Sequence, residues 1–237
     1  MSKQDCKKIT EQAWQKFFEK DFQSSVDIFE EVLEAEEENK EAIYGKACAL
    51  FRLLDYDAAE KDYNKLIKIS PNDSKLFHAR GLLKGADENA EGAIKDLEKA
   101  FDLEPESAEA CQDLAFAYLT AEEYNKAALA FEKLVELHKN CPQGWCGKGL
   151  VALFKKEHKK AVEYFNLAIK SEPNYLLALL ARADAYLELG KTAEAQRDLK
   201  KVLGIDAKIF DKKSEDLEDD DENINEDDEI EEFDIDD

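Results

Sequence analysis

The hydrophobic positions of this chain recur with helical spacing, and the same arrangement of large and small residues returns every 34 residues. One column of the repeat holds only small side chains, at Ser25, Ala59, Ala93, Ala127, Ala161 and Ala195. A second column, four positions later, holds larger apolar side chains, at Phe29, Tyr63, Leu97, Phe131, Phe165 and Leu199. Columns that keep their character over six steps predict a protein built from six similar units.

Each 34-residue period contains two apolar stripes of helical spacing, separated by a polar break such as residues 53–57 or 120–124. Prolines recur in phase with the repeat at Pro71, Pro105 and Pro173, where they prevent the second helix of their unit from continuing. Two antiparallel helices cross closely where side chains are small, and larger residues one turn away fill the surrounding space. The pattern therefore predicts an all-α chain of stacked helix pairs, with units at 6–39, 40–73, 74–107, 108–141, 142–175 and 176–209.

The fifth of these units carries the most complete motif, with Trp145, Gly149, Ala161, Phe165, Ala168 and Pro173. On these residues the chain resembles the tetratricopeptide repeat family, which is built from 34-residue helix–turn–helix units. The resemblance covers residues 6–209 and implies a right-handed superhelical solenoid. It also implies that the first helices of successive units line a concave surface, where members of the family usually bind their ligands.

The resemblance places a largely apolar set of side chains toward that concave surface: Trp14, Tyr44, Phe51, His78, Leu82, Gln112, Phe116, Leu150, Phe154 and Leu180. Such a strip implies a partner protein that inserts an amphipathic helix or an extended peptide with hydrophobic anchors. Aromatic residues such as Trp14 and Phe116 would then contribute most of the binding energy. The alternative is that some of these side chains turn into contacts between helices.

Some members of the family clamp the acidic C-terminal tails of heat-shock chaperones with Lys, Asn and Arg side chains from their first three units. The matching positions here are Thr10, Trp14, Gly45, Lys75 and Ala79, and only Lys75 keeps the expected residue type. The sequence therefore disfavours a co-chaperone clamp of this kind.

The sequence contains no recognisable catalytic motif, so we predict a protein that is not an enzyme and needs no cofactor. The three histidines, His78, His138 and His158, fall at unrelated positions of the repeat, and no Gly-rich phosphate loop or nucleophile motif is present. Cys141 and Cys146 lie close to His138 and offer zinc-type ligands, but the gap between the two cysteines is loose for a structural zinc site. We predict no metal site and interpret both cysteines as small packing residues.

Charge divides the chain into a repeat region and an intensely acidic end. Of the formal net charge of −23, residues 211–237 contribute −15, from 17 acidic residues and two lysines. A segment this acidic cannot bury a core, so we predict a disordered tail over 210–237. It would keep the open end of the solenoid soluble, bind a basic partner, or dock on the protein's own groove. A basic patch at the turn of the fifth unit is a candidate binding site for the acidic tail: Lys155, Lys156, Lys159 and Lys160.

Two functions are open on the sequence alone. The first is a non-catalytic adaptor or scaffold that holds another protein in the concave groove. The alternative is an acidic chaperone or escort of basic proteins, of histone or ribosomal type, that uses its tail. The net negative charge disfavours sequence-independent binding to nucleic acid and to anionic membranes.

The location of the protein is predicted from three further features. Residues 1–10 carry no signal-peptide pattern, and no apolar run approaches the ~18 residues that span a bilayer. The five cysteines are odd in number and irregularly spaced, unlike a disulfide framework. We therefore predict a cytoplasmic protein, whose oligomeric state the sequence leaves open.

Overall fold

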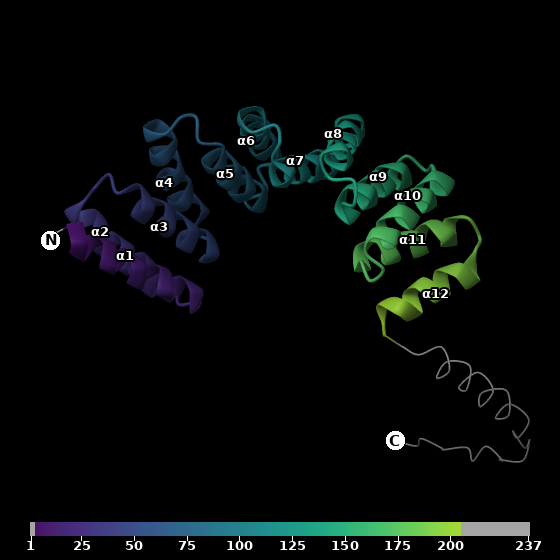
Figure 1. The fold of residues 1–237 in the computed structure, drawn as a ribbon, viewed down its shortest axis with the longest axis horizontal. Helices are drawn as coiled ribbons and strands as arrows, with labels where there is room; N and C mark the ends of the chain where they lie inside the picture. The colour runs from purple at the N-terminus through teal and green to yellow at the C-terminus, as the bar shows by residue number, and fades with distance from the viewer. Residues whose placement is uncertain (1–2, 205–237) are drawn as a thin grey trace, which may run out of the picture.

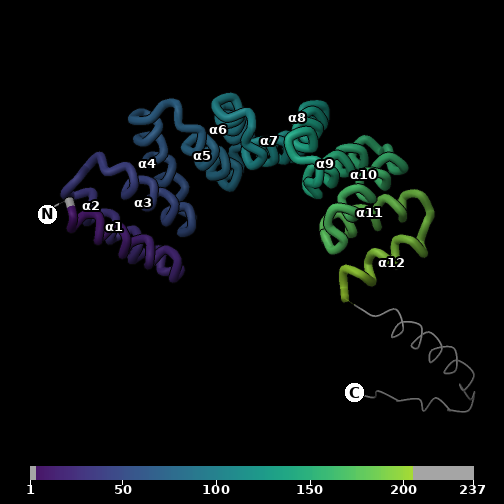
Figure 2. Tube along the Cα trace, in the orientation of Figure 1, coloured from purple at the N-terminus to yellow at the C-terminus, as the bar shows by residue number. Residues whose placement is uncertain are grey.

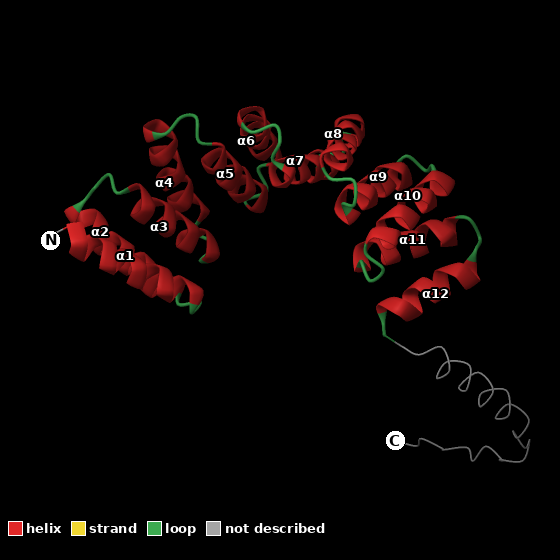
Figure 3. Ribbon diagram, in the orientation of Figure 1, coloured by secondary structure: helices red, strands yellow, loops and turns green. Residues whose placement is uncertain are grey.

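Helices follow one another through residues 3–204, the part of the chain that this computed structural model describes. These residues form twelve α-helices and no strand, joined by turns of a few residues (Figures 1 and 3). The helices are α1 (Lys3–Phe18), α2 (Phe22–Ala35), α3 (Lys40–Arg52), α4 (Tyr56–Ile69), α5 (Ser74–Ala86), α6 (Ala90–Leu103), α7 (Ala108–Thr120), α8 (Tyr124–Leu137), α9 (Pro142–Phe154), α10 (His158–Ser171), α11 (Leu176–Glu188) and α12 (Thr192–Val202). The predicted all-α solenoid of antiparallel helix pairs is confirmed, whereas the predicted tail at 210–237 lies outside the described residues.

Short polar side chains fix where many of the helices begin. Asn39 accepts a hydrogen bond from the backbone N–H of Ala42 at 3.0 Å, and Asp21 and Asp55 cap α2 and α4 in the same way. Each cap satisfies one of the backbone N–H groups that the first turn of a helix leaves unpaired. The polar breaks of the sequence are therefore helix starts as well as gaps between apolar stripes.

The turn inside each helix pair has the same backbone geometry throughout. One residue with positive φ follows each odd-numbered helix, and these residues recur every 34 positions: Lys20, Leu54, Glu88, Glu122, Lys156 and Gly190. In the first pair, the N–H of Asp21 donates to the carbonyl of Lys16 at 3.0 Å, a bond typical of helix ends with this geometry. Because only glycine adopts this conformation freely, five of the six turns carry some backbone strain.

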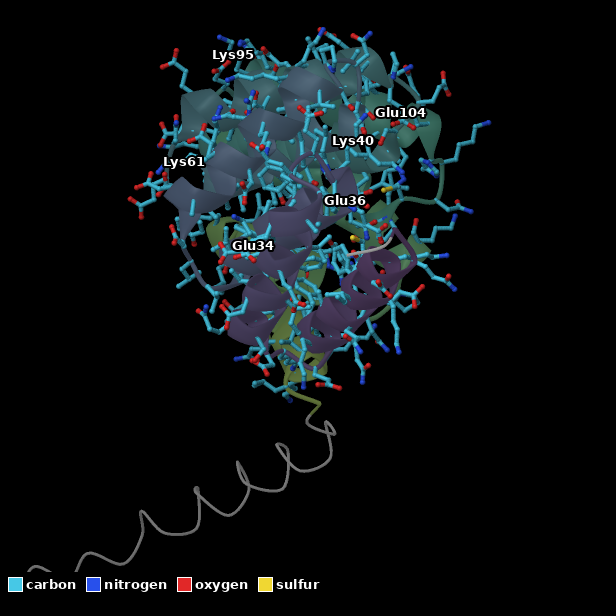
Figure 4. All side chains as sticks on the ribbon, turned by 90° about the vertical axis from the view of Figure 1, so that its left-hand side faces the viewer. Glu34, Glu36, Lys40, Lys61, Lys95 and Glu104 are labelled. Atoms are coloured by element: carbon cyan, nitrogen blue, oxygen red, sulfur yellow. The ribbon has the colours of Figure 1, made fainter. Side chains whose placement is uncertain are left out.

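The helix pairs stack in sequence order into an open arc (Figure 2). Between α3 and α8, the even-numbered helices lie on the outer rim and the odd-numbered helices lie nearer the inside (Figure 1). Most odd-numbered helices also contact the next odd-numbered helix. Seen from the α1–α2 end, charged side chains such as Lys61 of α4 and Lys95 of α6 project from the rim (Figure 4). The arc therefore has an inner face built from odd-numbered helices.

The repeated columns form the core of the solenoid. All six residues of the small column are buried, and Phe29, Phe131 and Phe165 of the large column are fully buried. Two glycines show how closely the helices approach. A Cβ placed on Gly45 would lie 2.1 Å from the ring of Phe29, and one on Gly147 would lie 2.1 Å from the ring of Phe131. The aromatic side chain of one unit therefore packs directly on the backbone of the next unit's first helix.

A polar contact between neighbouring helices, which the sequence analysis did not identify, occurs at two places along the solenoid. Arg182 of α11 donates from Nε and Nη2 to the two carboxylate oxygens of Asp198, at 2.7 and 2.6 Å, and from Nη1 to Asn166 at 2.6 Å. The hydrogen bond to Asp198 raises the pKa of Arg182. Because a bidentate pair has a fixed geometry, it helps to set the angle between helices. The same contacts recur three units earlier, in a set that consists of Asn64, Arg80 and Asp96.

Candidate functional site on the inner face

Several side chains of the odd-numbered helices contact the next odd-numbered helix. The ring centroids of Trp14 on α1 and Tyr44 on α3 lie 6.5 Å apart. His78 Nε2 on α5 lies 2.7 Å from Asp113 Oδ2 on α7. Trp14, Tyr44 and His78 all belong to the set predicted for the concave surface. The structure therefore brings these predicted residues to the seams between neighbouring odd-numbered helices.

The N-terminal part of the inner face is aromatic. Trp14 packs edge-to-face on Phe17, with ring centroids 5.5 Å apart, and stacks on Phe18 at 6.1 Å. Phe18 is 75% exposed, although large aromatic side chains are usually buried. The sequence analysis missed Phe18, whose signal was the repeat position that it shares with Phe154. The ring of Phe18 is therefore exposed to solvent and held in place by stacking on Trp14.

The middle of the inner face is polar. The hydrogen bond to Asp113 raises the pKa of His78 and outweighs the lowering effect of burial. Gln112, beside Asp113 on α7, is partly buried and lines a pocket of about 640 Å³ at the α8–α9 turn.

Two apolar side chains of the predicted set lie in the same middle part. Leu82 is 42% exposed, whereas Phe116 is partly buried against an aromatic ring of the core. Phe116 therefore contributes to the fold as well as to the surface.

The C-terminal part of the inner face is rich in exposed apolar side chains. Phe154 is 55% exposed, Leu180 is 42% exposed and Leu187 is 50% exposed. Phe154 and Leu187 line a pocket of about 630 Å³ between α9 and α11, together with Lys156 and Asp184. The sequence analysis missed Leu187, because a leucine in a helical stripe resembles a core residue. Two helices thus present apolar side chains and charges of both signs around one hollow.

Two predicted groove residues, Phe51 and Leu150, lie at contacts between helices. Phe51 is partly buried against Tyr56 of α4, with ring centroids 5.9 Å apart. Leu150 packs against core residues on both sides of α9. Both side chains keep part of their surface exposed, so each serves the fold and the inner face together. The binding role of all ten predicted residues stays a prediction.

The predicted basic patch lies at the turn between α9 and α10. Lys155 donates to Asn125 Oδ1 at 2.8 Å, and Lys160 pairs with Glu157 at 3.0 Å. Asp184 and Glu188 line the neighbouring hollow with Lys156, so the charge beside the patch is mixed. All four lysines of the patch are exposed: Lys155, Lys156, Lys159 and Lys160.

The cysteines and histidines weighed as zinc ligands form no metal-binding group within residues 3–204. Cys146 is fully buried, and burial raises the pKa of its thiol to about 12. Cys141 instead caps α9, because its Sγ accepts from the backbone N–H of Gly144 at 3.4 Å. All five cysteines are unpaired. As for membranes, none of the helices in the described range combines the length and apolar character needed to span one.

The positions of a chaperone-tail clamp offer little to an acidic peptide. Thr10 is buried and donates to the backbone carbonyl of Cys6 at 2.9 Å. Gly45 lies against Phe29 and leaves no room for a side chain. Lys75 is exposed, and it is the one cation among the five positions. The structure thus adds a steric reason to the mismatch seen in the sequence.

Comparison with known proteins finds the same repeat. Family models described as tetratricopeptide repeat match residues 40–73, 86–153, 142–175 and 177–209. Tetratricopeptide repeat protein 13 of Homo sapiens is 27% identical over 175 residues, which cover 72% of this chain and 19% of that protein. The chain therefore spans about a fifth of the length of this relative.

Two solved structures show a similar arrangement of helices. MamA is 26% identical with a TM-score of 0.62, over 71% of this chain and 92% of that chain. A tetratricopeptide repeat protein from Parabacteroides merdae ATCC 43184 is 20% identical with a TM-score of 0.76, over 85% of this chain and 80% of that chain. The second likeness concerns the fold alone.

Proposed function

The chain belongs to the tetratricopeptide repeat family, and from this premise we propose that it is a non-catalytic adaptor whose inner face binds a segment of another protein. The observation that carries the proposal is the exposure of large apolar side chains on odd-numbered helices, at Phe18 near one end and at Phe154 and Leu187 near the other. Exposed apolar surface is unfavourable in water, and clusters of it mark binding surfaces.

The chemistry of the inner face specifies the kind of segment that fits it. The aromatic cluster around Trp14 and Phe18 takes one hydrophobic anchor, and the hollow beside Phe154 takes another. Between them, the His78–Asp113 pair favours polar groups of the partner. An amphipathic helix or an extended peptide with anchors at both ends has this pattern. Because the face is built on packed helices, most of the ordering cost of binding falls on the partner.

The escort function is the alternative, and it depends on a different part of the chain. Its active element would be residues 211–237, which carry 17 acidic residues and lie outside the described range. Capture of basic proteins by such a segment weakens as salt screens the charges. Binding through apolar anchors on the inner face is less sensitive to salt. Salt dependence therefore separates the two functions.

The test compares proteins captured from a native lysate by the wild-type full-length chain and by a Phe154→Ser/Leu180→Ser double variant. Leu129→Ser is the matched control, because Leu129 is 69% exposed but lies on α8 of the outer rim. We expect the double variant to lose salt-resistant partners that the wild type and the control retain. Equal capture by all three chains would refute the inner face as the binding site. Loss of basic, salt-sensitive proteins on removal of 211–237 would favour the escort function.

A further inference from the structure

A basic side chain on an odd-numbered helix bonds to the preceding even-numbered helix at four of the five places where one unit meets the next. In each case the donor stands 16 residues after its acceptor. The four donors also share one position of the 34-residue repeat. The pairs are Lys46 with Glu30, Arg80 with Asn64, Lys148 with Glu132, and Arg182 with Asn166.

The fifth place, where the third unit meets the fourth, lacks this cation. The donor position there holds Leu114 of α7, which is 5% exposed. The acceptor position still holds a carboxylate, Glu98 of α6, and its Oε1 accepts from the hydroxyl of Tyr118 at 2.5 Å. Within residues 3–204, no lysine or arginine forms an ion pair with Glu98. The acceptor of the repeated contact is therefore present without its basic partner.

A hollow of about 410 Å³ opens at this place, between α6 and α8 of the outer rim (Figure 1). It is lined by Leu114 and Ala130, together with Glu98. The corresponding hollow one unit later is only about 90 Å³, and there Lys148 and Tyr164 stand at the positions of Leu114 and Ala130. The larger hollow is thus the space that a long basic side chain fills in the next unit.

The charged groups around the hollow favour a cation. Glu98 and Asp102 line it with Lys126 and Lys133. Lys126 is already paired with Glu123, at 2.6 Å. The remaining charges are two carboxylates and one lysine, which sum to −1.

The next unit shows that a lysine at the position of Lys126 does not exclude a second cation. Its counterpart, Lys160, pairs in the same way with Glu157, at 3.0 Å. Lys160 also lines the small hollow beside Lys148. A basic side chain is therefore compatible with this arrangement of charges.

We propose that the hollow between α6 and α8 binds an arginine or lysine side chain of a partner protein, which takes the place of the missing cation. The aliphatic stem of this side chain packs on Leu114 and Ala130, and its head group bonds to Glu98. The site lies on the outer rim and goes beyond the function proposed for the inner face.

Because the contact depends on charge, it weakens as salt is added. The partners that we expect on the inner face are resistant to salt, so the two kinds of binding can be separated. Leu129 also lines the hollow. Leu129→Ser is therefore a control for the salt-resistant partners of the inner face only.

A titration of the full-length chain with a small arginine compound tests the proposal. The probe is N-acetyl-argininamide, and the reference is N-acetyl-citrullinamide, in which a neutral urea group replaces the guanidinium. In proton–nitrogen correlation spectra, we expect the backbone amides of residues 98, 114 and 130 to shift saturably with the arginine compound. The apparent Kd should be at least about five-fold lower than for the citrulline compound. Equal values would overturn the proposal, because the charge would then contribute nothing.

Two substitutions on either side of the hollow sharpen the test. Glu98→Gln removes the charge but keeps an acceptor for Tyr118, and it should raise the Kd for the arginine compound at least about five-fold. The matched control is Glu132→Gln, which changes the equivalent acceptor where Lys148 is already bound and should leave that Kd unchanged. Leu114→Arg supplies a cation from α7 and should abolish the shifts.

Wild-type binding of the arginine compound by the Glu98→Gln chain overturns the proposal, and so do shifts that persist in a folded Leu114→Arg chain. Circular dichroism shows whether Leu114→Arg folds, and if it does not, Glu98→Gln decides alone. Tighter binding of N-acetyl-leucinamide at the same amides would assign the hollow to an apolar side chain and would also reject a basic one. Since the hollow lies on the outer rim, none of these outcomes bears on the function proposed for the inner face.

Discussion

The contact between Gly147 and Phe131 predicts that one added methyl group destabilises the solenoid. Gly147 lies inside α9, where alanine is normally more stable than glycine by roughly 0.5–1 kcal/mol. Here the new Cβ would lie 2.1, 2.3 and 2.4 Å from three ring carbons of Phe131, a fully buried side chain. Gly147→Ala should therefore lower the free energy of unfolding despite the gain in helix propensity.

The magnitude follows from the shift that the ring of Phe131 would need. Ordinary Cβ contacts begin at 3.4 Å, so the ring or α9 must withdraw by about 1 Å. Movement of the ring also disturbs its edge-to-face contact with Phe116, at a centroid distance of 5.1 Å. Overpacking of this kind typically costs about 1–3 kcal/mol. After the gain in helix propensity is subtracted, the net loss is centred near ~1 kcal/mol and does not exceed about 2.5 kcal/mol.

Gly85 provides the matched control for this substitution. It lies near the end of α5, and a Cβ there would meet only the side chain of Ala93, at 3.8 Å. Gly85→Ala should therefore raise the free energy of unfolding by about 0.5 kcal/mol. Urea unfolding followed by far-ultraviolet circular dichroism measures both variants. A Gly147→Ala chain as stable as the wild type would refute the packing explanation, because the helices would then not be held at this spacing.

Three further predictions concern a cap, a turn and a titrating pair. Asn39→Ala removes the N-cap of α3 and should lower the free energy of unfolding by about 1 kcal/mol in the same urea titration. Leu54→Gly relieves a backbone φ of 65° and should raise the unfolding midpoint by an amount that corresponds to about 0.5–1 kcal/mol; an unchanged midpoint would show that the turn is unstrained. Because the folded-state pKa of His78 is raised, the bond to Asp113 stabilises the fold fully below the unfolded pKa of about 6.5, and this contribution is lost as pH rises through the folded pKa. The stability difference between wild type and His78→Gln should therefore be about 1 kcal/mol near pH 5.5 and smaller near pH 8, and a difference independent of pH would contradict this reasoning.

The fold was predictable because the same helix packing repeats in every unit, whereas the polar contacts between neighbouring helices were not. Small residues such as Ala161 recur at a fixed spacing, and the structure buries them. Arg182 and Asp198, by contrast, stand among other charged residues of polar helix faces, where such pairs are usually solvated. Only the stacked backbone gives them bidentate geometry. The available signal was an arginine and an aspartate 16 residues apart, which recur at Arg80 and Asp96.

The candidate site was predictable by position but not by exposure. Tyr44 and His78, which the repeat register predicts for the concave surface, lie at contacts with a neighbouring odd-numbered helix. Phe116 and Leu180 occupy groove positions alike, yet Phe116 packs on a core ring and Leu180 stays 42% exposed. The exposed fraction of a side chain at such a position depends on the size of the residues on the neighbouring helix and on the distance between the two helices. Neither quantity can be read from a repeat pattern.

One position of the repeat, the last residue of each odd-numbered helix, holds a different type of residue in nearly every unit. The last residues of the six odd-numbered helices are all exposed: Phe18, Arg52, Ala86, Thr120, Phe154 and Glu188. A position that holds an aromatic ring, a cation, a methyl group and a carboxylate in different units is not fixed by the packing that all units share, unlike the small column, which is buried in every unit. Because the fold accepts any of these residues, the identity of each is free to follow a partner. Phe18 and Phe154 are the two exposed aromatic rings at this position. For this reason we propose that they contact the hydrophobic anchor residues of the partner.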